Sequence, residues 1–278
     1  MKSVFKKGRL ELAFEKFGTG NHTFIFLHGY GKTKGDFNDL ASKLPAKYCG
    51  ITIDLPFHGE SENQELQDAL ALSKEEWSHW VSALVKAHGG SEGHSMVAFS
   101  IGARLALCHA ESEPEGLQHL ILLAPDGFIV NPWNMFFTRN RIGRRLFKNA
   151  MRMSNSTDIL VRKLAQVKLI DVRKQKIIED NIRGSEAKMK LYHTWVVFKS
   201  LWPDQNWLKK ENGLSWGNTL IMLGKHDSVI PSRQIQEWVP EPWKGRVIRE
   251  FNFGHDLMVS RVFQEVEREI ALLITSQE

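Results

Sequence analysis

Three polar residues that lie shortly after apolar runs have the types needed for nucleophilic chemistry. They are Ser100, Asp227 and His255. A serine hydroxyl is a weak nucleophile at neutral pH and needs a base, and an imidazole base needs a carboxylate to fix its tautomer. These residue types predict Ser100 as nucleophile, His255 as general base and Asp227 as the carboxylate that orients the imidazole. The preceding apolar runs are Ser95–Phe99, Thr219–Leu223 and Arg246–Phe251.

The residues around Ser100 are typical of a tight turn between a strand and a helix. Such a turn forces strained backbone angles on the serine, so the residues two positions away must be small, as Ala98 and Gly102 are. The amide of Ile101 then lies at a helix N-terminus, where it can donate to a developing oxyanion. Taken alone, this motif also fits a serine that only caps a helix.

A second oxyanion donor is predicted at an earlier turn. The apolar run Thr23–Leu27 ends in His28-Gly29-Tyr30-Gly31. The two glycines allow the backbone to approach a substrate closely, and the amide of Tyr30 would point at the oxyanion. The alternative is a glycine-rich phosphate cradle, but neither Gly-Lys-Ser/Thr nor GxGxxG follows.

The order of the motifs favours one site over three unrelated residues. Alone, Asp227 would be read as a turn residue and His255 as a capping or surface residue. Serine, then acid, then histidine, each after a predicted strand, is the order of one known arrangement of the triad. Asp126, after the run Leu117–Leu123, is the alternative acid, and Asp256 is expected to cap the last helix.

Neither a metal nor a cofactor is predicted. The eleven histidines show no H-x-x-H or HExxH spacing, and the two cysteines do not form a zinc-binding pair. Both cysteines lie in apolar stretches and are expected to be reduced core residues.

Alternating strands and helices must position these residues. Most of the later strands are apolar without alternation, as in parallel strands buried on both faces, which predicts an α/β fold with a mostly parallel, doubly wound sheet. Ser3–Phe5 and Leu10–Phe17 read as an antiparallel hairpin at its edge. The other predicted strands are Thr23–Leu27, Gly50–Asp54, Ser95–Phe99, Leu117–Leu123, Thr219–Leu223 and Arg246–Phe251. The predicted helices are Asp36–Leu44, Lys74–His88, Ile101–Ala110, Ser232–Trp238 and Asp256–Ile274.

The alternation is interrupted by an all-helical stretch. Residues 127–216 show helical patterns and no convincing strand, and are expected to form a cap inserted into a core of residues 1–126 and 217–278. Such an insertion would lie over the carboxyl ends of the strands, where open sheets bind ligands. Its large apolar residues would line an acyl-binding cavity or, in most cases, pack the cap onto the sheet. They include Trp133, Met135, Phe136, Phe137, Trp195, Phe198 and Trp202.

Taken together, the chain resembles the α/β-hydrolase superfamily over nearly its whole length. The resemblance is to the serine branch with a helical cap, which includes esterases, thioesterases and carbon–carbon-bond hydrolases. It implies that Asp54 and His58 belong to a structural turn and are not catalytic. The family usually has glycine where this chain has Phe57 and Ala98. The matching segments are His28-Gly29-Tyr30-Gly31, Asp54-Leu55-Pro56-Phe57-His58-Gly59-Glu60-Ser61, Ala98-Phe99-Ser100-Ile101-Gly102, Gly224-Lys225-His226-Asp227 and Gly254-His255.

The net charge of +5 is unevenly distributed. Residues 138–190 hold 15 Lys and Arg against 5 Asp and Glu, so this stretch carries +10 and the remainder −5. The stretch is a solvated face, a region that attracts an anionic substrate, or a docking site for an anionic membrane. No recognition motif for nucleic acid accompanies it.

Composition and N-terminus predict a soluble cytoplasmic protein. Hydrophobic residues make up 42% and charged residues 25% of the 278 residues, as in ordinary globular proteins. Neither a signal peptide nor stable insertion into a membrane is expected.

The expected function is hydrolysis of an ester or thioester of a small-molecule acyl substrate through an acyl-enzyme on Ser100. The alternatives are a carbon–carbon-bond hydrolase or lyase that uses the same triad, and a non-catalytic ligand-binding protein with this fold. The oligomeric state is not predicted.

Overall fold

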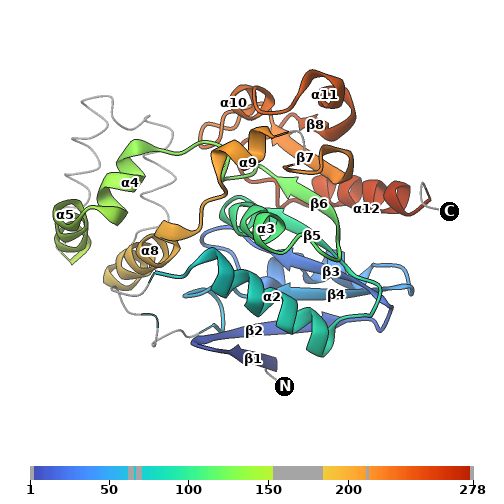
Figure 1. Cartoon of the computed structure of the whole chain (residues 1–278), viewed down its shortest axis with the longest axis horizontal. Helices are drawn as coiled ribbons and strands as arrows, with labels where there is room; N and C mark the ends of the chain where they lie inside the picture. Colours follow the sequence, from blue (N-terminus) through green and yellow to red (C-terminus); the bar gives the residue numbers. More distant parts are fainter. Residues whose placement is uncertain (1–2, 62–65, 67–70, 153–183, 211–212, 276–278) are drawn as a thin grey trace.

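The computed structural model describes residues 3–61, 66, 71–152, 184–210 and 213–275. Its centre is an eight-stranded sheet in the order β1-β2-β4-β3-β5-β6-β7-β8 (Figure 1). The strands are β1 (Ser3–Lys7), β2 (Leu10–Phe17), β3 (His22–Leu27), β4 (Tyr48–Ile53), β5 (His94–Phe99), β6 (Leu117–Leu123), β7 (Thr219–Gly224) and β8 (Ile248–Phe251).

The sheet is parallel from β4 to β8, and the hairpin of β1 and β2 joins it antiparallel through β4. Every residue of β3, β4, β5 and β7 is buried. Burial on both faces explains why these strands read as continuous apolar runs. The predicted fold class, a mostly parallel α/β sheet of the α/β-hydrolase type, is confirmed.

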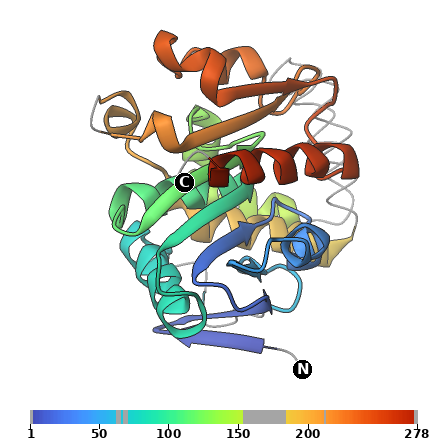
Figure 2. The same cartoon turned by 90° about the vertical axis from the view of Figure 1, so that its right-hand side faces the viewer.

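Helices cover both faces of the sheet (Figure 2). Ile25 and Leu27 of β3 point into the core layer that contains α2 and α3, whereas Phe24 and Phe26 point into the layer with α1 and α12. This alternation follows from the two-residue period of a strand. The covering helices are η1 (Lys34–Phe37), α1 (Asn38–Ser42), α2 (Lys74–His88), α3 (Ile101–Ser112), α10 (Ser232–Gln236), α11 (Glu241–Val247) and α12 (Ser260–Thr275).

The start of α2 shows how local sequence fixes an element. Ser73 accepts a hydrogen bond from the amide of Glu76, and the Glu76 carboxylate accepts one from the amide of Ser73, which forms a capping box. Trp77, Trp80 and Leu84 then recur on one buried face. The helix has the bounds that the sequence predicts.

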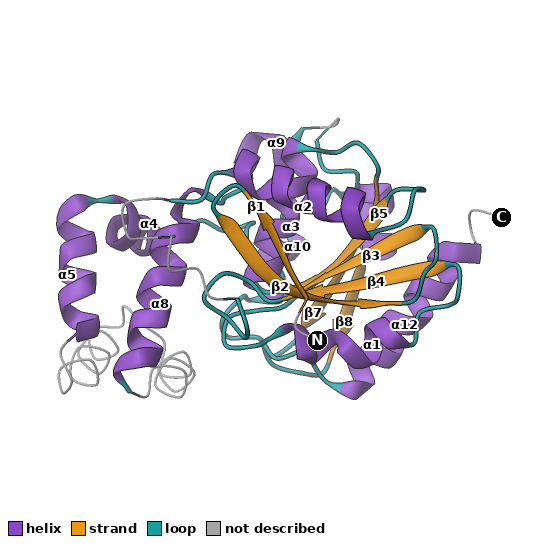
Figure 3. Ribbon diagram, turned by 90° about the horizontal axis from the view of Figure 1, so that it is seen from below, coloured by secondary structure: helices purple, strands orange, loops and turns teal. Residues whose placement is uncertain are grey.

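The segments between β6 and β7 that the structure describes contain helices and no strand. The helices of residues 132–139, 141–152 and 185–197 lie beyond the edge of the sheet (Figure 3). The second and third of them share a small apolar cluster around Met151, Tyr192 and Val196. Leu208 and Leu214, by contrast, belong to the apolar cluster of the core. The elements are α4 (Pro132–Arg139), α5 (Arg141–Arg152), α8 (Ser185–Val197), η2 (Phe198–Ser200), α9 (Gln205–Lys209) and η3 (Trp216–Asn218).

Two predicted boundaries near the C-terminus are wrong. The strand predicted from Arg246 begins at Ile248, because the two residues before Ile248 are the last two of α11, which follows Pro240. The helix predicted from Asp256 begins at Ser260. The Asp256 carboxylate accepts a hydrogen bond from the amide of Met258, so it forms a turn ahead of the helix and does not cap it.

Candidate active site

Ser100 lies at the turn between β5 and α3 in a strained conformation. Its φ of 52° and ψ of −118° are sparsely populated for a residue with a side chain, and such strain costs roughly 1–3 kcal/mol. A Cβ on Gly102 would lie 2.4 Å from the carbonyl oxygen of Leu27, so that position must be glycine. Ala98 is fully buried between β3 and β6. The neighbours of Ser100 are thus small because backbone from the adjacent strands surrounds the turn.

The structure brings Ser100, His255 and Asp227 together. Ser100 Oγ lies 3.0 Å from His255 Nε2, and His255 Nδ1 lies 2.8 Å from Asp227 Oδ2. The other carboxylate oxygen of Asp227 accepts hydrogen bonds from the amides of Val229 and Ile230 at 2.7 and 2.8 Å. Because a carboxylate only accepts, Nδ1 donates to it and Nε2 is left to accept from the serine hydroxyl.

Two loops that hydrogen-bond to each other position the acid and the histidine. In the loop after β7, the amide of Lys225 donates to the carbonyl of Phe251 at the end of β8, and the amide of His226 donates to the carbonyl of Phe253 in the loop after β8. A Cβ on Gly224 would lie 2.2 Å from the carbonyl oxygen of Gly254, so the loops meet without room for a side chain there. This contact sets the distance between Asp227 and His255.

The other two carboxylates near the triad in sequence have different partners. Asp126, the alternative acid, accepts a hydrogen bond from the amide of Gly127 and lies 3.6 Å from the guanidinium of Arg104. Asp256 pairs with Lys32 at 2.9 Å. The carboxylate that contacts the imidazole of His255 is that of Asp227.

The turn that carries Tyr30 lies beside the serine. A Cβ on Gly29 would lie 2.6 Å from the ring of Phe99 and 3.2 Å from the Cβ of Ser100, so the turn that carries Tyr30 passes directly against the serine. Ile101 is the first residue of α3, where the amide has no acceptor within the helix. That the amides of Tyr30 and Ile101 donate to an oxyanion stays a prediction.

The side chain of Tyr30 points toward the helices beyond the sheet edge. Its hydroxyl donates to the carbonyl oxygen of Ala187 in α8 at 3.5 Å, and burial raises the pKa of Tyr30 to about 12. The phenol stays protonated at neutral pH and links the turn that carries Tyr30 to α8.

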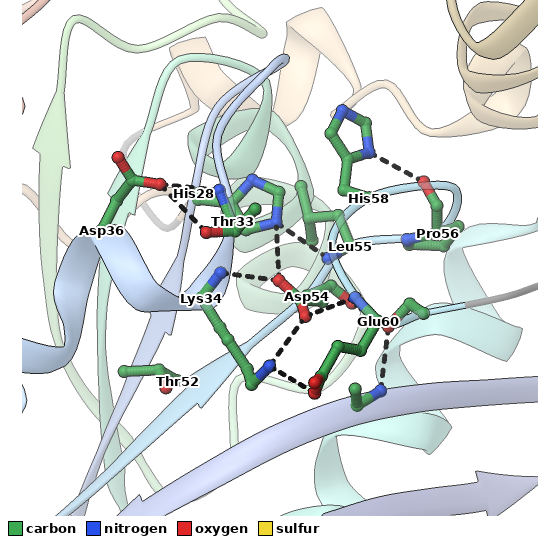
Figure 4. Close-up of polar contacts among 12 residues, drawn as sticks. His28, Thr33, Lys34, Asp36, Thr52, Asp54, Leu55, Pro56, His58 and Glu60 are labelled. Carbon is green, nitrogen blue, oxygen red and sulfur yellow. Dashed lines mark hydrogen bonds and ion pairs between the residues drawn. The ribbon is translucent and has the colours of Figure 1, made fainter. Parts of the chain in front are cut away.

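A polar network around Asp54 holds the turn of residues 28–31 in place (Figure 4). The Asp54 carboxylate accepts hydrogen bonds from the amides of Lys34 and Glu60 and from the Lys34 ammonium, at 2.7, 2.9 and 3.0 Å. His28 donates from Nδ1 to the carbonyl of Gly29 and accepts at Nε2 from the amide of Leu55. Burial lowers the pKa of His28 to about 4, so it stays neutral and keeps this pattern.

The next turn contains a strained phenylalanine. Phe57 stands where the family usually has glycine and adopts a φ of 66°, and its ring lies 5.6 Å from that of His193 in α8. Its neighbour His58 donates from Nδ1 to the carbonyl of Pro56, and burial lowers the pKa of His58 to about 3. Phe57 thus makes its contact with α8 from a strained backbone conformation, which costs about 1 kcal/mol or more.

Sequence reasoning did not single out one buried cation near the site. Arg104 is 4% exposed, lies one helical turn after Ser100, and stacks on the ring of Trp202 at 4.3 Å. Its Nε has no hydrogen-bond partner among the described residues. The signal was available, because a charged residue within the apolar helix Ile101–Ala110 is uncommon unless it has a partner or ligand.

The described residues contain no group of three or more histidine, cysteine or acidic side chains that could hold a metal ion. Within the same part of the chain, no helix is both long and apolar enough to span a membrane.

Residues 22–262 match the model of the alpha/beta hydrolase fold family, which is most of the chain. The chain belongs to this family. The esterase from Thermogutta terrifontis, bound to malate in its structure, superimposes with a TM-score of 0.64 over 96% of this chain and 94% of its own, at 16% identity. A hydrolase from Pseudomonas aeruginosa superimposes with a TM-score of 0.65 over 98% of each chain, at 13% identity. The predicted family and the α/β-hydrolase class of enzyme are thereby confirmed.

One sequence relative is more similar over a shorter stretch. The 2-succinyl-6-hydroxy-2,4-cyclohexadiene-1-carboxylate synthase of Serratia proteamaculans is 34% identical over 99 residues. These residues are 35% of this chain and 36% of the Serratia enzyme. The matched stretch thus covers little more than a third of either protein.

Proposed function

We propose that this α/β-hydrolase cleaves an ester or thioester bond of a small-molecule acyl substrate through an acyl-enzyme on Ser100. The observation that carries the proposal is the chain of two hydrogen bonds, from Ser100 to His255 and from His255 to Asp227. The structural neighbours, which include esterases, agree with this reaction class.

In the first half-reaction, His255 Nε2 takes the proton of Ser100 as Oγ attacks the acyl carbon. The Asp227 carboxylate stabilises the imidazolium that forms. The amides of Tyr30 and Ile101 donate to the negatively charged oxygen of the tetrahedral intermediate, and one such donor is worth about 3 kcal/mol. The imidazolium then gives its proton to the departing alcohol or thiol.

In the second half-reaction, water replaces the leaving group. The neutral His255 removes a proton from this water, which attacks the acyl-enzyme, and Ser100 departs with the proton returned by the imidazolium. Each cycle consumes one water and regenerates Ser100 and His255, so the cycle itself requires no cofactor.

The test is turnover of acyl esters and thioesters of graded length and charge. We expect Ser100→Ala to lower kcat by several orders of magnitude, because the nucleophile is lost while the fold remains. Ser112→Ala, at the other end of the same helix, serves as the matched control and should keep full activity. Equal turnover by Ser100→Ala and the parent would refute the proposal.

A second candidate reaction is elimination at carbon without an acyl-enzyme. In that reaction the Ser100–His255 pair removes a proton next to a carbonyl, and a group on the adjacent carbon leaves with the bonding electrons. Two observations favour it. The Serratia relative is named as the synthase of a carboxylate product, and Arg104 supplies a buried cation one turn from Ser100.

The two reactions differ in the intermediate. Hydroxylamine added during turnover captures an acyl-enzyme as an acyl hydroxamate, whereas an elimination leaves nothing to capture. Hydroxamate formed by the parent and absent from Ser100→Ala supports acyl transfer. Turnover of a substrate with a leaving group next to an acidic C–H, without hydroxamate, supports elimination.

A further inference from the structure

The hairpin of α4 and α5, residues 132–152, projects away from the sheet (Figures 1 and 3). The two helices touch closely, because a Cβ on Gly143 would lie 2.3 Å from the carbonyl oxygen of Phe136. Met151 and Phe147 on the inner side of α5 pack with Tyr192 of α8. The inner face of the hairpin is therefore occupied, and its outer face is open.

The hairpin also carries large apolar side chains that are exposed. Ile142 is 70% exposed, Leu146 54%, Trp133 51% and Phe136 38%. Within the described part of the chain these are four of the six exposed large hydrophobic residues. A gathering of this kind on one hairpin, flanked by polar groups, is typical of an interaction surface and not of a solvated face.

The same hairpin is strongly basic. It contains six Lys and Arg and no Asp or Glu. Arg141 and Arg145 are exposed and lie one turn apart, as do Ile142 and Leu146. On a helix residues three apart are neighbours, so the guanidinium of Arg145 lies beside the exposed side chain of Ile142.

We propose that the α4–α5 hairpin docks on the surface of an anionic phospholipid bilayer. Its exposed apolar side chains would enter the boundary between headgroups and acyl chains, and the arginines would contact lipid phosphates. Tryptophan and phenylalanine suit this boundary because an apolar ring is tolerated beside polar headgroups.

Charge selects this partner over two others. A second copy of the chain docking through the same face would bring six cations against six, which is unfavourable. A nucleic acid would satisfy the cations but leave Ile142 and Leu146 without an apolar partner. A bilayer with anionic headgroups satisfies the cations and the apolar side chains at once.

The test is flotation of the full chain with vesicles. One set contains phosphatidylcholine alone, and the other contains equal parts of phosphatidylcholine and phosphatidylglycerol. We expect the protein to float only with the anionic vesicles at low salt and to be released as salt rises, because screening weakens the contacts of the cations.

Paired variants separate the two components of the surface. Arg141→Ser with Arg145→Ser should lower vesicle affinity about thirtyfold, since each cation near a charged bilayer contributes about 1 kcal/mol. Ile142→Ser with Leu146→Ser should lower it about tenfold or more through lost apolar contact. The matched controls are Arg233→Ser on α10, where the side chain is 92% exposed, and Val4→Ser on β1.

All variants change exposed residues outside the proposed triad, so turnover of a short water-soluble ester should equal that of the parent. Loss of flotation in both paired variants, with flotation kept in both controls, supports the proposal. Three results would overturn it: no binding of the parent to anionic vesicles, equal binding of parent and paired variants, or a parent dimer that Ile142→Ser with Leu146→Ser converts to a monomer without any lipid effect. The first of these results, together with binding of the parent to duplex DNA, would identify a nucleic acid as the partner.

Discussion

A buried pair of histidines at the end of β5 opposite to Ser100 makes stability depend on pH. His94 Nε2 lies 2.8 Å from His109 Nε2, and both residues are buried. Desolvation lowers the pKa of His94 to about 4 and, with the charge of His94, that of His109 to about 3. A proton on the accepting nitrogen turns this hydrogen bond into two opposed N–H groups, so the folded state keeps both rings neutral.

The sign and size of the effect follow from linkage. In the unfolded chain both histidines titrate near pH 6.5, so below that pH the unfolded state binds more protons than the folded state. Stability is therefore full above about pH 7 and falls as the pH drops toward the folded values. At pH 4.5 protonation of the unfolded state has lowered the free energy of unfolding by about 3 kcal/mol for each histidine. This is large against a typical total of about 5–15 kcal/mol.

Replacing one partner tests this reasoning. At pH 7.5, His109→Leu should lower the free energy of unfolding by about 1–3 kcal/mol, because His94 loses its partner. At pH 4.5 the variant has one buried histidine fewer to protonate, so the deficit should shrink by about 3 kcal/mol and the two proteins should become similar.

Urea denaturation at both pH values measures the difference directly. His79→Leu, which removes a histidine that is 72% exposed, provides the control, and its effect should change little between the two conditions. A deficit of His109→Leu that is the same at pH 7.5 and pH 4.5 would refute the assignment of neutral buried rings.

The remaining predictions concern the proposed site. Asp227→Asn should lower kcat about ten-thousandfold by favouring the wrong imidazole tautomer, whereas Asp126→Asn should lower it little; similar losses in kcat/KM would contradict the assignment of the acid. Gly224→Ala should push the two loops of the site apart and so lower kcat at temperatures where the variant is still folded. A variant as active as the parent would contradict the close contact. Tyr30→Phe removes the hydroxyl that reaches α8 but keeps the amide of residue 30, so kcat on short esters should stay within about threefold of the parent. Activity should be lost at a lower urea concentration than in the parent. A large drop in kcat would contradict a role for the amide alone.

Much of the fold was predictable because strong periodic patterns decide it. The buried strands β3, β5 and β7 have no alternation, and α2 has both a capping box and an apolar stripe, so their bounds came out within a residue. The strand predicted from Arg246 was longer than the real one, because a short apolar run at a helix end looks like the start of a strand.

The three polar residues after strands were predictable for a topological reason. The carboxyl ends of parallel strands meet at one edge of the sheet, so residues that follow β5, β7 and β8 become neighbours there. The contact between Gly224 and Gly254 was not predictable, since it depends on how two loops pack. The position of Arg104 against Trp202 likewise joins residues far apart in the chain.

The basic stretch shows where sequence alone stops. Charge counts over residues 138–190 allowed three interpretations, and part of the stretch lies outside the described residues. In α5 the exposure of Ile142 and Leu146 near the arginines favours the docking interpretation that we propose. The aromatic residues predicted to line a cavity or pack the cap differ in burial: Phe198 is buried, whereas Trp133 is half exposed.

The central claim is that Ser100 is the nucleophile activated by His255. Its most direct test is mass spectrometry of the protein after reaction with a fluorophosphonate, with and without His255→Ala. The account predicts one adduct on the peptide that contains Ser100, formed much more slowly by His255→Ala and absent from Ser100→Ala. A folded parent protein that remains unlabelled, or that carries the adduct on another residue, would contradict it.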